Sequence, residues 1–440
     1  MTATRKLFGT DGVRGVAGAD LTAPLAHRLG VAGARFAGPG GRVLIGRDTR
    51  ESGVWLEEAL VGGIIAAGGH AQSAGVIPTP GVAVLSRRSG AQLGAVISAS
   101  HNPYQDNGIK FIGGDGRKLT DADEQRIEAL VDSDAEASGG SAETVDGAAA
   151  EYVEWLAATY GEGVPAGAAL AVDCGNGAAH AVAPALMARL GLQTDAIGVS
   201  PDGRNINDGV GSTHLDAVVR LVTERGLPGG IAFDGDADRC LAVDSRGRTV
   251  NGDAIVAVLA IDRRRRGVLD AGTVVVTSMT NMGFYRLMRD SGIALEVTDV
   301  GDRYVLERMT ATGATLGGEQ SGHVVDLVHH TTGDGLATAL MLLAALERLG
   351  MTLDDAAELV VPYPQKLVAV AADRSRLADA ERVWQEVDAA AAKLGMDGRV
   401  VVRASGTEPV VRVMVEAADL GECEAICDHL SAVVSDEIGV

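Results

Sequence analysis

The sequence predicts an α/β protein with three related α/β domains containing mixed sheets and a smaller C-terminal α+β domain. Three observations lead to this prediction. At 440 residues the chain is too long for one hydrophobic core and fits roughly three to four domains. Apolar strands alternate with helical stretches in the same order three times, which indicates parallel or mixed sheets covered on both faces. From residue 363 onwards this order changes.

Each of the three rounds is expected to read strand, helix, strand, turn, helix, strand, and each ends in a polar loop. The first round follows a helix over 24–36 and has strands over 43–48, 72–77 and 93–98, with helices over 52–68 and up to 89. The second has strands from 169, over 194–199 and over 230–233, with helices up to 190 and over 215–225. The third has strands over 273–277, 293–298 and 314–316, with helices from 283 and over 303–310.

These rounds set the expected domain boundaries. We predict domain I at 1–150, domain II at 151–252, domain III at 253–362 and domain IV at 363–440. Residues 132–150 are acidic, small and weakly patterned, which is typical of a surface segment between domains. The last domain is expected to contain a strand over 366–371, a helix over 378–394, a hairpin of 399–403 with 410–416, and a final helix.

Composition narrows the possible partners and location. A formal net charge of −21 argues against nucleic acid and against an anionic membrane as partners. The run Arg263–Arg266 precedes Gly267 and is predicted to be a solvated helix C-terminus. Four cysteines make no disulfide framework in a chain of this size, so buried thiols are expected. No signal region and no apolar run of spanning length occur, so we expect a cytoplasmic protein.

A serine and a lysine lie on one predicted hairpin at the end of the first round. The strand over 93–98 leads into a polar loop with Ser100 at its tip. Asp106-Asn-Gly108 predicts a turn, and the return strand carries Lys110. No Gly-x-Ser-x-Gly elbow surrounds Ser100, so an α/β-hydrolase nucleophile is not indicated. A hydroxyl and an ammonium brought together suggest phosphate chemistry.

Three carboxylates follow the last strand of the second round. Asp234, Asp236 and Asp238 stand at i, i+2 and i+4, and in extended chain they would project to one side, which suits a hard cation. An EF-hand is excluded because its sixth and twelfth positions would be Arg239 and Ser245. Asp-x-Asp also opens the nucleophile motif of the haloacid-dehalogenase phosphatases, but a third aspartate stands here where that motif has an apolar or hydroxyl residue. We therefore predict a Mg²⁺ site, with Arg239 beside it.

Two further loops offer groups for a sugar phosphate. Gly317-Gly-Glu-Gln-Ser-Gly-His323 presents Glu319 and Ser321, which suit sugar hydroxyls, and His323, a candidate proton shuttle. Arg403-Ala-Ser-Gly-Thr-Glu-Pro-Val-Val-Arg412 places two arginines around a loop with two hydroxyls and a glycine. Such a loop can form an anion nest that a dianionic phosphate fits.

With these loops in view, the chain resembles the α-D-phosphohexomutases. The matching segments, in order, are Phe8–Gly15, Ser98–Pro103 with Asp106–Phe111, Asp234–Arg239, Gly318–His323 and Arg403–Pro409. The resemblance covers the whole chain and implies four domains around a central active-site cleft, with one loop from each domain. Ala237 stands where many relatives have glycine, which matters if that position needs a positive φ.

The resemblance also implies a role for each matching residue. The implied catalytic residues are Ser100, Lys110, Arg14 and His323. The implied Mg²⁺ ligands are Asp234, Asp236, Asp238 and an oxygen of phosphorylated Ser100. Substrate binding is implied for Arg239, Glu319 and Ser321, and for Arg403, Ser405, Gly406, Thr407 and Arg412, which grip the phosphate that is not reacting.

The activity implied is interconversion of glucosamine 6-phosphate and glucosamine 1-phosphate, through a phosphoserine and a glucosamine 1,6-bisphosphate that serves as intermediate and activator. This activity feeds the synthesis of UDP-N-acetylglucosamine and of cell-wall precursors. Gln320 and the opening motif favour glucosamine over the glucose and mannose phosphates of phosphomannomutase/phosphoglucomutase. A metal-dependent sugar phosphatase is the alternative from another class. A homodimer is implied by the family alone.

Overall fold

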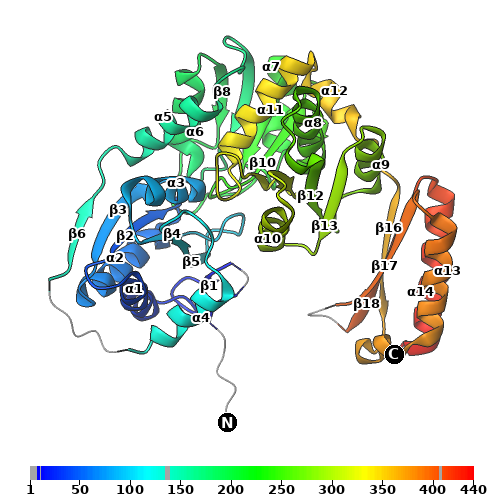
Figure 1. Ribbon diagram of the computed structural model, residues 1–440, viewed down its shortest axis with the longest axis horizontal. Helices are drawn as coiled ribbons and strands as arrows, with labels where there is room; N and C mark the ends of the chain where they lie inside the picture. Colours follow the sequence, from blue (N-terminus) through cyan, green and yellow to red (C-terminus); the bar gives the residue numbers. More distant parts are fainter. Residues whose placement is uncertain (1–6, 10, 134–138, 406–408) are drawn as a thin grey trace. The chain divides into compact units, whose positions relative to one another are not determined.

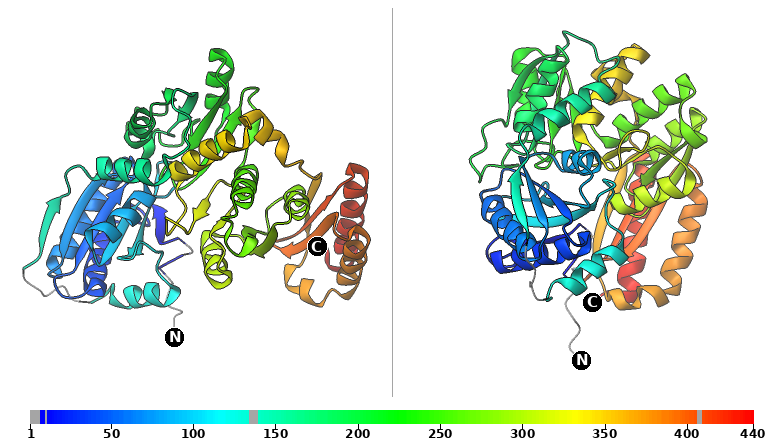
Figure 2. Two further views of the ribbon diagram at one scale, coloured as in Figure 1. Left: turned by 45° about the horizontal axis from the view of Figure 1, so that its top comes forward. Right: turned by 60° about the vertical axis from the view of Figure 1, so that its left-hand side comes forward.

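The computed structural model describes residues 7–9, 11–133, 139–405 and 409–440 (Figures 1 and 2). The chain divides into two compact units, each of which is described by itself. The first unit comprises Met1–Ser278 with Glu296–Leu359, and the second comprises Met279–Leu295 with Val360–Val440.

The first unit begins with a six-stranded mixed sheet in the order β1-β5-β4-β2-β3-β6. The strands are β1 (Val13–Val16), β2 (Arg42–Arg47), β3 (His70–Val76), β4 (Leu93–Ile97), β5 (Asp106–Gly113) and β6 (Ser141–Thr144). The helices are α1 (Ala23–Ala37), α2 (Glu51–Ala66), α3 (Thr79–Ser89) and α4 (Asp121–Leu130). β5 is antiparallel to both of its neighbours, whereas β4, β2, β3 and β6 run parallel.

Alternating side chains of β4 divide the two faces of this sheet. Leu93, Ala95 and Ile97 enter the same buried cluster as residues of α1 and α2. On the other face, a Cβ at Gly94 would lie 2.7 Å from the Oγ of Ser86 on α3. Helices therefore cover both faces of β4, and its end opens into the loop that carries the predicted serine.

Helices α1 and α2 pack closely because glycines stand at their contact. A Cβ at Gly30 would lie 2.1 Å from the carbonyl oxygen of Leu60, and one at Gly63 would lie 2.0 Å from that of His27. Neither distance admits a side chain. These two glycines therefore set the spacing of the helices behind the serine loop.

A second, five-stranded sheet has the order β11-β10-β9-β7-β8. Its strands are β7 (Ala169–Asp173), β8 (Gln193–Ile197), β9 (Gly229–Phe233), β10 (Cys240–Asp244) and β11 (Thr249–Val250). The helices of this part are α5 (Ala148–Tyr160), α6 (Ala179–Arg189) and α7 (Asp216–Arg225). β9 is buried throughout and leads directly into the predicted metal loop.

A third, four-stranded sheet has the order β13-β12-β14-β15. Its strands are β12 (Thr273–Thr277), β13 (Ala294–Thr298), β14 (Leu316–Gly318) and β15 (Val324–Asp326). The helices of this part of the chain are α8 (Gly252–Arg266), α10 (Asp302–Thr312), α11 (Gly335–Leu349) and α12 (Leu353–Leu359), of which α12 packs against β10 and β11 of the second sheet, and a 3-10 turn covers Asp270–Gly272. β14 and β15 are antiparallel and enclose the predicted sugar loop.

The second unit contains α9 (Met282–Asp290) and an antiparallel sheet in the order β16-β18-β17. The strands are β16 (Gln365–Ala371), β17 (Gly398–Ala404) and β18 (Val410–Ala417), and a 3-10 helix covers Arg374–Asp379. Two helices, α13 (Glu381–Leu394) and α14 (Leu420–Ile438), pack on one face of this sheet (Figure 1). Their apolar side chains and those of the strands form one buried cluster.

The predicted fold class is confirmed: three mixed α/β sheets are followed by a smaller α+β part. The exact domain boundaries stay predictions. The four cysteines are free and buried. Among the described residues no single helix is long and apolar enough to cross a membrane, and only α11 with α12, bent by 94°, passes that test as a pair.

Three local predictions are wrong. Asp106–Gly108 is no turn, because β1 pairs with these residues and β5 begins there, with the buried Asn107 donating to Ser52 at 2.9 Å. Residues 141–144, expected in a weakly patterned segment, form β6 at the edge of the first sheet. The run Arg263–Arg266 does end α8 before Gly267, with Arg264–Arg266 exposed as expected, but Arg263 is buried and pairs with Asp326 at 2.9 Å.

Candidate active site

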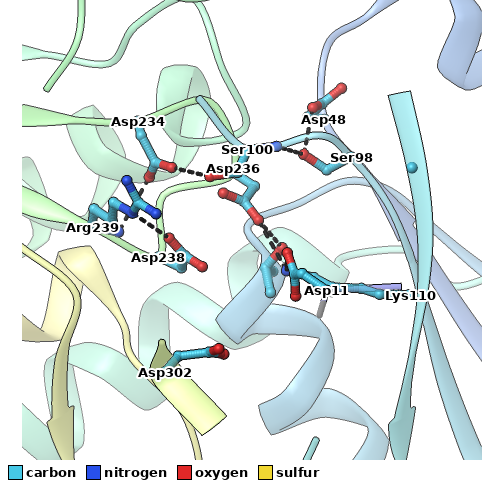
Figure 3. A network of polar contacts seen from close by, with 12 residues as sticks. Asp11, Asp48, Ser98, Ser100, Lys110, Asp234, Asp236, Asp238, Arg239 and Asp302 are labelled. Atoms are coloured by element: carbon cyan, nitrogen blue, oxygen red, sulfur yellow. Dashed lines mark hydrogen bonds and ion pairs between the residues drawn. The ribbon is translucent and has the colours of Figure 1, made fainter. Parts of the chain in front are cut away.

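The serine loop follows β4 and holds Ser100 in an unusual backbone conformation. Ser100 has φ 51, in the left-handed region, and only 4% of its surface is exposed. Its Oγ donates a hydrogen bond to Oδ2 of Asp234 at 2.6 Å and lies 3.3 Å from Nδ1 of His101 (Figure 3). The predicted phosphate carrier and the first predicted metal ligand therefore meet, although 134 residues separate them.

The metal loop brings its three carboxylates together by a turn. Oxygens of Asp234, Asp236 and Asp238 lie within 4.8 Å of one another. The extended chain expected here is wrong, because the loop reverses at Ala237, whose φ is 56 and whose N–H bonds to the carbonyl of Asp234 at 3.0 Å. The position where relatives often carry glycine does therefore require a positive φ, and the alanine adopts it.

Buried oxygens of this loop fit a cation. Oδ1 of Asp236 and Oδ1 of Asp238 are buried and have no hydrogen-bond partner among the described residues. Burial, together with the neighbouring carboxylates of Asp238 and Asp236, raises the pKa of Asp234 well above its usual value. Buried carboxylates with vacant acceptor oxygens are what a hard divalent ion binds, and such an ion would relieve their mutual repulsion.

Lys110 reaches the metal loop from β5. Its Nζ lies 3.3 Å from Oδ2 of Asp236 and 3.9 Å from Oδ2 of Asp11. Burial opposes the charge, but these two carboxylates outweigh it and raise the pKa of Lys110, so the ammonium stays protonated. Thr79, at the start of α3, donates to the same oxygen of Asp236 at 2.5 Å.

Asp11 gathers cations at one side of the site. Arg14 and Lys118 both form ion pairs with it, the second at 3.3 Å. Lys118 also bridges to Asp302 at the start of α10, at 2.9 Å. Burial would raise the pKa of Asp11, but Lys110, Lys118 and Arg14 together lower it. Asp11 thus joins the cations of the first sheet, and Lys118 links this group to the third sheet.

The sugar loop lies between β14 and β15. Oε1 of Glu319 accepts from the N–H of Gly301 at 3.1 Å, and Oγ of Ser321 is buried without a hydrogen-bond partner among the described residues. Gln320 donates to Asp253 at 3.4 Å and is not among the residues that line the cavity described below. The sequence analysis used Gln320 as an indication that the substrate is a glucosamine phosphate, but in the structure its side chain contacts α8.

His323 lies between the sugar loop and the metal loop. Its Nδ1 is 3.6 Å from Oδ2 of Asp238, and Nε2 is buried without a hydrogen-bond partner among the described residues. Burial disfavours the charged ring, but Asp238 outweighs this and raises the pKa of His323 to about 9. Its nearest charged partner is therefore a predicted metal ligand.

Arg239 follows the three carboxylates. Its N–H donates to Oδ1 of Asp234 at 3.2 Å, and its Nε lies 3.9 Å from Oδ1 of Asp238. The first is a contact of the backbone, and the second places the guanidinium beside the metal loop (Figure 3).

These three loops enclose a cavity of about 340 Å³ within the first unit. Six of the predicted residues line it: Arg14, Ser100, Asp238, Arg239, Glu319 and His323. Asp302 and Tyr304 also line it, from α10. The cavity is small and is lined by charged side chains of both signs, which suits a sugar phosphate better than an apolar ligand.

The phosphate loop belongs to the second unit. Arg403 on β17 stands directly opposite Arg412 on β18 in the antiparallel register. Ser405 is buried, and its carbonyl accepts from Arg374 at 2.6 Å. The predicted residues Gly406 and Thr407 lie outside the described residues. The register therefore places the two predicted arginines beside each other across the hairpin.

Sequence reasoning missed several residues at this site. Asp11, Thr79, Lys118 and Asp302 all contact predicted residues or their neighbours. Asp11 stands inside the glycine-rich motif Phe8–Gly15, which is a sequence signal for it. Thr79 stands between two prolines and Asp302 follows a glycine, but these patterns predict turns and no contact with the site; Lys118 has no distinctive neighbours.

Four family models together match almost the whole chain, all of them phosphoglucomutase/phosphomannomutase domains. Alpha/beta/alpha domain I matches residues 5–138, domain II 144–247, domain III 251–363 and the C-terminal domain 367–433. Among solved structures, a phosphoglucomutase/phosphomannomutase family protein from Burkholderia thailandensis superposes with a TM-score of 0.82 at 26% identity, over 98% of this chain and 97% of that one.

Curated relatives are closer in sequence. Phosphoglucosamine mutase of Thermobifida fusca is 47% identical over 99% of both chains. Phosphoglucosamine mutase of Streptomyces coelicolor is also 47% identical, over 99% of this chain and 100% of its own. An Aspergillus fumigatus N-acetylphosphoglucosamine mutase, solved with GlcNAc-6P and magnesium, shares the fold with a TM-score of 0.68 at 19% identity, over 99% and 96% of the two chains. The chain therefore belongs to the phosphoglucomutase/phosphomannomutase family and, within it, to the phosphoglucosamine mutases.

Proposed function

We propose that the chain interconverts glucosamine 6-phosphate and glucosamine 1-phosphate, with Ser100 as a phosphoserine carrier. The observation that supports this best is the 2.6 Å contact between Ser100 Oγ and Asp234, at the edge of a cavity lined by Arg14 and Glu319. Similarity to phosphoglucosamine mutases over nearly the whole chain supplies the substrate class.

The reaction needs two phosphoryl transfers. Phosphorylated Ser100 gives its phosphoryl group to the 1-hydroxyl of glucosamine 6-phosphate: the bond from phosphorus to Oγ breaks, the bond to O1 forms, and the hydroxyl proton ends on Oγ. The glucosamine 1,6-bisphosphate then reverses its orientation in the cavity, so that its 6-phosphate faces Ser100. In the second transfer the bond from the 6-phosphoryl phosphorus to O6 breaks, the bond to Oγ of Ser100 forms, the proton of the serine hydroxyl ends on O6, and glucosamine 1-phosphate leaves. One serine cannot reach both ends of a sugar held in one orientation, so the bisphosphate has to reorient between the two transfers.

Mg²⁺ is the metal that we propose, with Asp234, Asp236 and Asp238 as its protein ligands. The buried, unpartnered oxygens of Asp236 and Asp238 favour this set, since carboxylate oxygens are the ligands that Mg²⁺ prefers. When bound, such an ion neutralises charge on the transferring group. Arg239, which contacts two of these aspartates, is proposed to support the loop and to face the phosphate.

The cations around the serine fit an electrostatic role. Because Nζ of Lys110 lies 3.3 Å from Asp236, we propose that it stabilises the transferring phosphoryl group and assists proton transfer there. Arg14, which pairs with Asp11 beside Lys110 and lines the cavity, is proposed to do the same. His323 is proposed to hold Asp238 in place and to assist proton movement.

Two groups of residues are proposed to bind the rest of the substrate. Glu319 and Ser321 would hold sugar hydroxyls, because a carboxylate and a buried, unpartnered hydroxyl suit them. The phosphate that is not reacting would be held by Arg403, Ser405, Gly406, Thr407 and Arg412. In this arrangement one clamp serves either phosphate of the bisphosphate.

Steady-state kinetics and mass spectrometry test the proposal. We expect intact-mass measurement to find one phosphate on the active protein and to place it on Ser100. Ser100→Ala should lose nearly all mutase activity, because no other hydroxyl lies at that distance from Asp234 among the described residues. Retained mutase activity in Ser100→Ala would contradict the carrier role.

Two comparisons separate the alternatives. We expect kcat/KM to be highest for glucosamine 6-phosphate, and a clear preference for glucose or mannose 6-phosphate would make the substrate assignment wrong. Steady release of inorganic phosphate that persists in Ser100→Ala would indicate a metal-dependent phosphatase instead.

A further inference from the structure

The backbone of Ser100 has its hydrogen-bonding capacity fully used. Its N–H donates to Oγ of Ser98 at 2.9 Å. Its carbonyl accepts from Nη2 of Arg50 at 2.9 Å and from Nδ2 of Asn207 at 3.0 Å. Only the hydroxyl of Ser100 remains for chemistry, and the left-handed φ of 51 is held from both ends.

Arg50 is the main support of the serine loop. It precedes α2, its side chain is fully buried, and its guanidinium donates to the carbonyl oxygens of Ser100, Asn102, Pro103 and Asp106. Four acceptors in one seven-residue segment match the fork of a guanidinium and no other side chain. The loop is therefore folded around this one cation.

A second residue closes the arrangement into a ring. Asp48 accepts from Nε of Arg50 at 2.9 Å and from Oγ of Ser98 at 2.6 Å, through the same oxygen. A closed chain of hydrogen bonds therefore leads from the N–H of Ser100 through Ser98, Asp48 and Arg50 back to the carbonyl of Ser100. Figure 3 labels Asp48, Ser98 and Ser100. All four residues are at least nine-tenths buried.

We propose that Asp48, Arg50 and Ser98 are positioning residues for phosphoryl transfer, which fix the backbone of Ser100 so that its Oγ faces Asp234 in each half of the reaction. The inference rests on the proposed function. Removing a buried ion pair in favour of apolar residues is often neutral for stability, so stability alone does not explain the Asp48–Arg50 pair. Its geometry matters instead, because a misplacement of about 1 Å at a reacting atom costs about a hundredfold in rate.

Ser98→Ala gives the mildest test. It removes one hydroxyl, which leaves the N–H of Ser100 without its acceptor, and Ser98 itself does not line the cavity. We expect kcat for glucosamine 6-phosphate to fall between about tenfold and a hundredfold with KM unchanged. Ser98→Thr keeps the hydroxyl and should restore most of kcat. A structural role alone would lower the melting temperature without this split between kcat and KM.

Arg50→Lys tests the guanidinium. Lysine keeps the charge beside Asp48 but cannot reach four carbonyls, so kcat should fall at least as far as in Ser98→Ala. Two matched controls are available on the same part of the fold. Ser86 is fully buried with an unpartnered Oγ among the described residues, and Arg47 pairs with Glu57. Ser86→Ala and Arg47→Lys should leave kcat unchanged.

These measurements distinguish failure of the proposed function from failure of the positioning role. An unmodified protein without mutase activity would refute the proposed function. An active protein in which Ser98→Ala and Arg50→Lys both keep kcat within about twofold, per folded molecule, would refute the positioning role while leaving the function intact. If Arg50→Lys fails to fold, the comparison of kcat between Ser98→Ala and Ser98→Thr still tests the positioning role.

Discussion

Gly333→Ala tests whether the position of the His323 ring matters for activity. A Cβ at Gly333 would lie 2.4 Å from Nε2 and 2.5 Å from Cε1 of that ring, whereas ordinary contact begins at 3.4 Å. The backbone of Gly333 pairs with Val325, and the carbonyl of His323 accepts from Glu319 at 3.0 Å. Both backbones are therefore anchored, and the ring itself must recede by about 1 Å.

That displacement has a calculable effect. The ring lies 3.6 Å from Asp238, so a shift of about 1 Å alters the contact with a proposed metal ligand. A misplacement of that size costs about a hundredfold in rate, equivalent to about 2.7 kcal/mol of transition-state stabilisation. Overpacking should also lower the free energy of unfolding by about 1 to 3 kcal/mol. The assay is kcat/KM for glucosamine 6-phosphate beside a thermal melt.

Gly62→Ala is the matched control. Its Cβ would lie 3.4 Å from Nδ1 of His27, an ordinary contact, and the position is inside α2. Alanine there should leave kcat/KM unchanged and stabilise the protein by up to about 1 kcal/mol. If Gly333→Ala keeps kcat/KM within about threefold while folding normally, the proposed role of His323 is wrong.

Three further predictions follow from the same contacts. Adding MgCl₂ should raise the melting temperature of the protein, and Asp236→Asn should abolish most of that rise because one buried ligand oxygen becomes an amide; an equal rise in the variant would contradict the proposed ligand set. When a chelator keeps the protein free of metal, the stability contributed by the His323–Asp238 pair should be fully present below about pH 6.5 and be lost as pH rises through about 9, because the pKa of His323 is higher in the folded than in the unfolded protein. Denaturant unfolding across this pH range should show the decline in stability, and His323→Gln should remove this pH dependence. Gly63→Ala, unlike Gly62→Ala, should destabilise the protein by about 3 kcal/mol or more in urea unfolding, since its Cβ would meet the carbonyl of His27 at 2.0 Å, and a neutral result would mean that α1 and α2 can separate freely.

The alternating rounds could be predicted because each element has its own signal. β12, with the sequence Thr-Val-Val-Val-Thr, is buried at all five positions, as its apolar run indicates. β1 and β6 have no such signal. β1 contains a glycine and ends exposed, and β6 is exposed at every position. Both exist because a neighbouring strand offers unpaired backbone groups, and that depends on the tertiary fold.

The chemical groups of the site could also be predicted, because each stands in a motif with a recognisable pattern. Their supports could not. Lys118 reaches Asp302 across 184 residues, and Thr79 reaches Asp236 across 157. Arg50 contacts only backbone carbonyls in the serine loop, so no side-chain pattern marks it. Sequence motifs do not indicate such residues, because their partners lie far away in the sequence or are backbone groups.

Two of the non-glycine residues with a left-handed φ lie where two of the loops meet. Ser100 and Ala237 both have left-handed φ values, 51 and 56, at a cost of about 1 kcal/mol each. The ring through Arg50 holds the first, and the N–H of Gly335, which donates to the carbonyl of Ala237 at 3.0 Å, holds the second. Glycine at 237 would relieve the strain but would lose a buried methyl worth about 0.8 kcal/mol, so the two effects nearly cancel. Alanine therefore costs little in stability and leaves the metal loop fewer alternative conformations, which keeps Asp234 in place for Ser100.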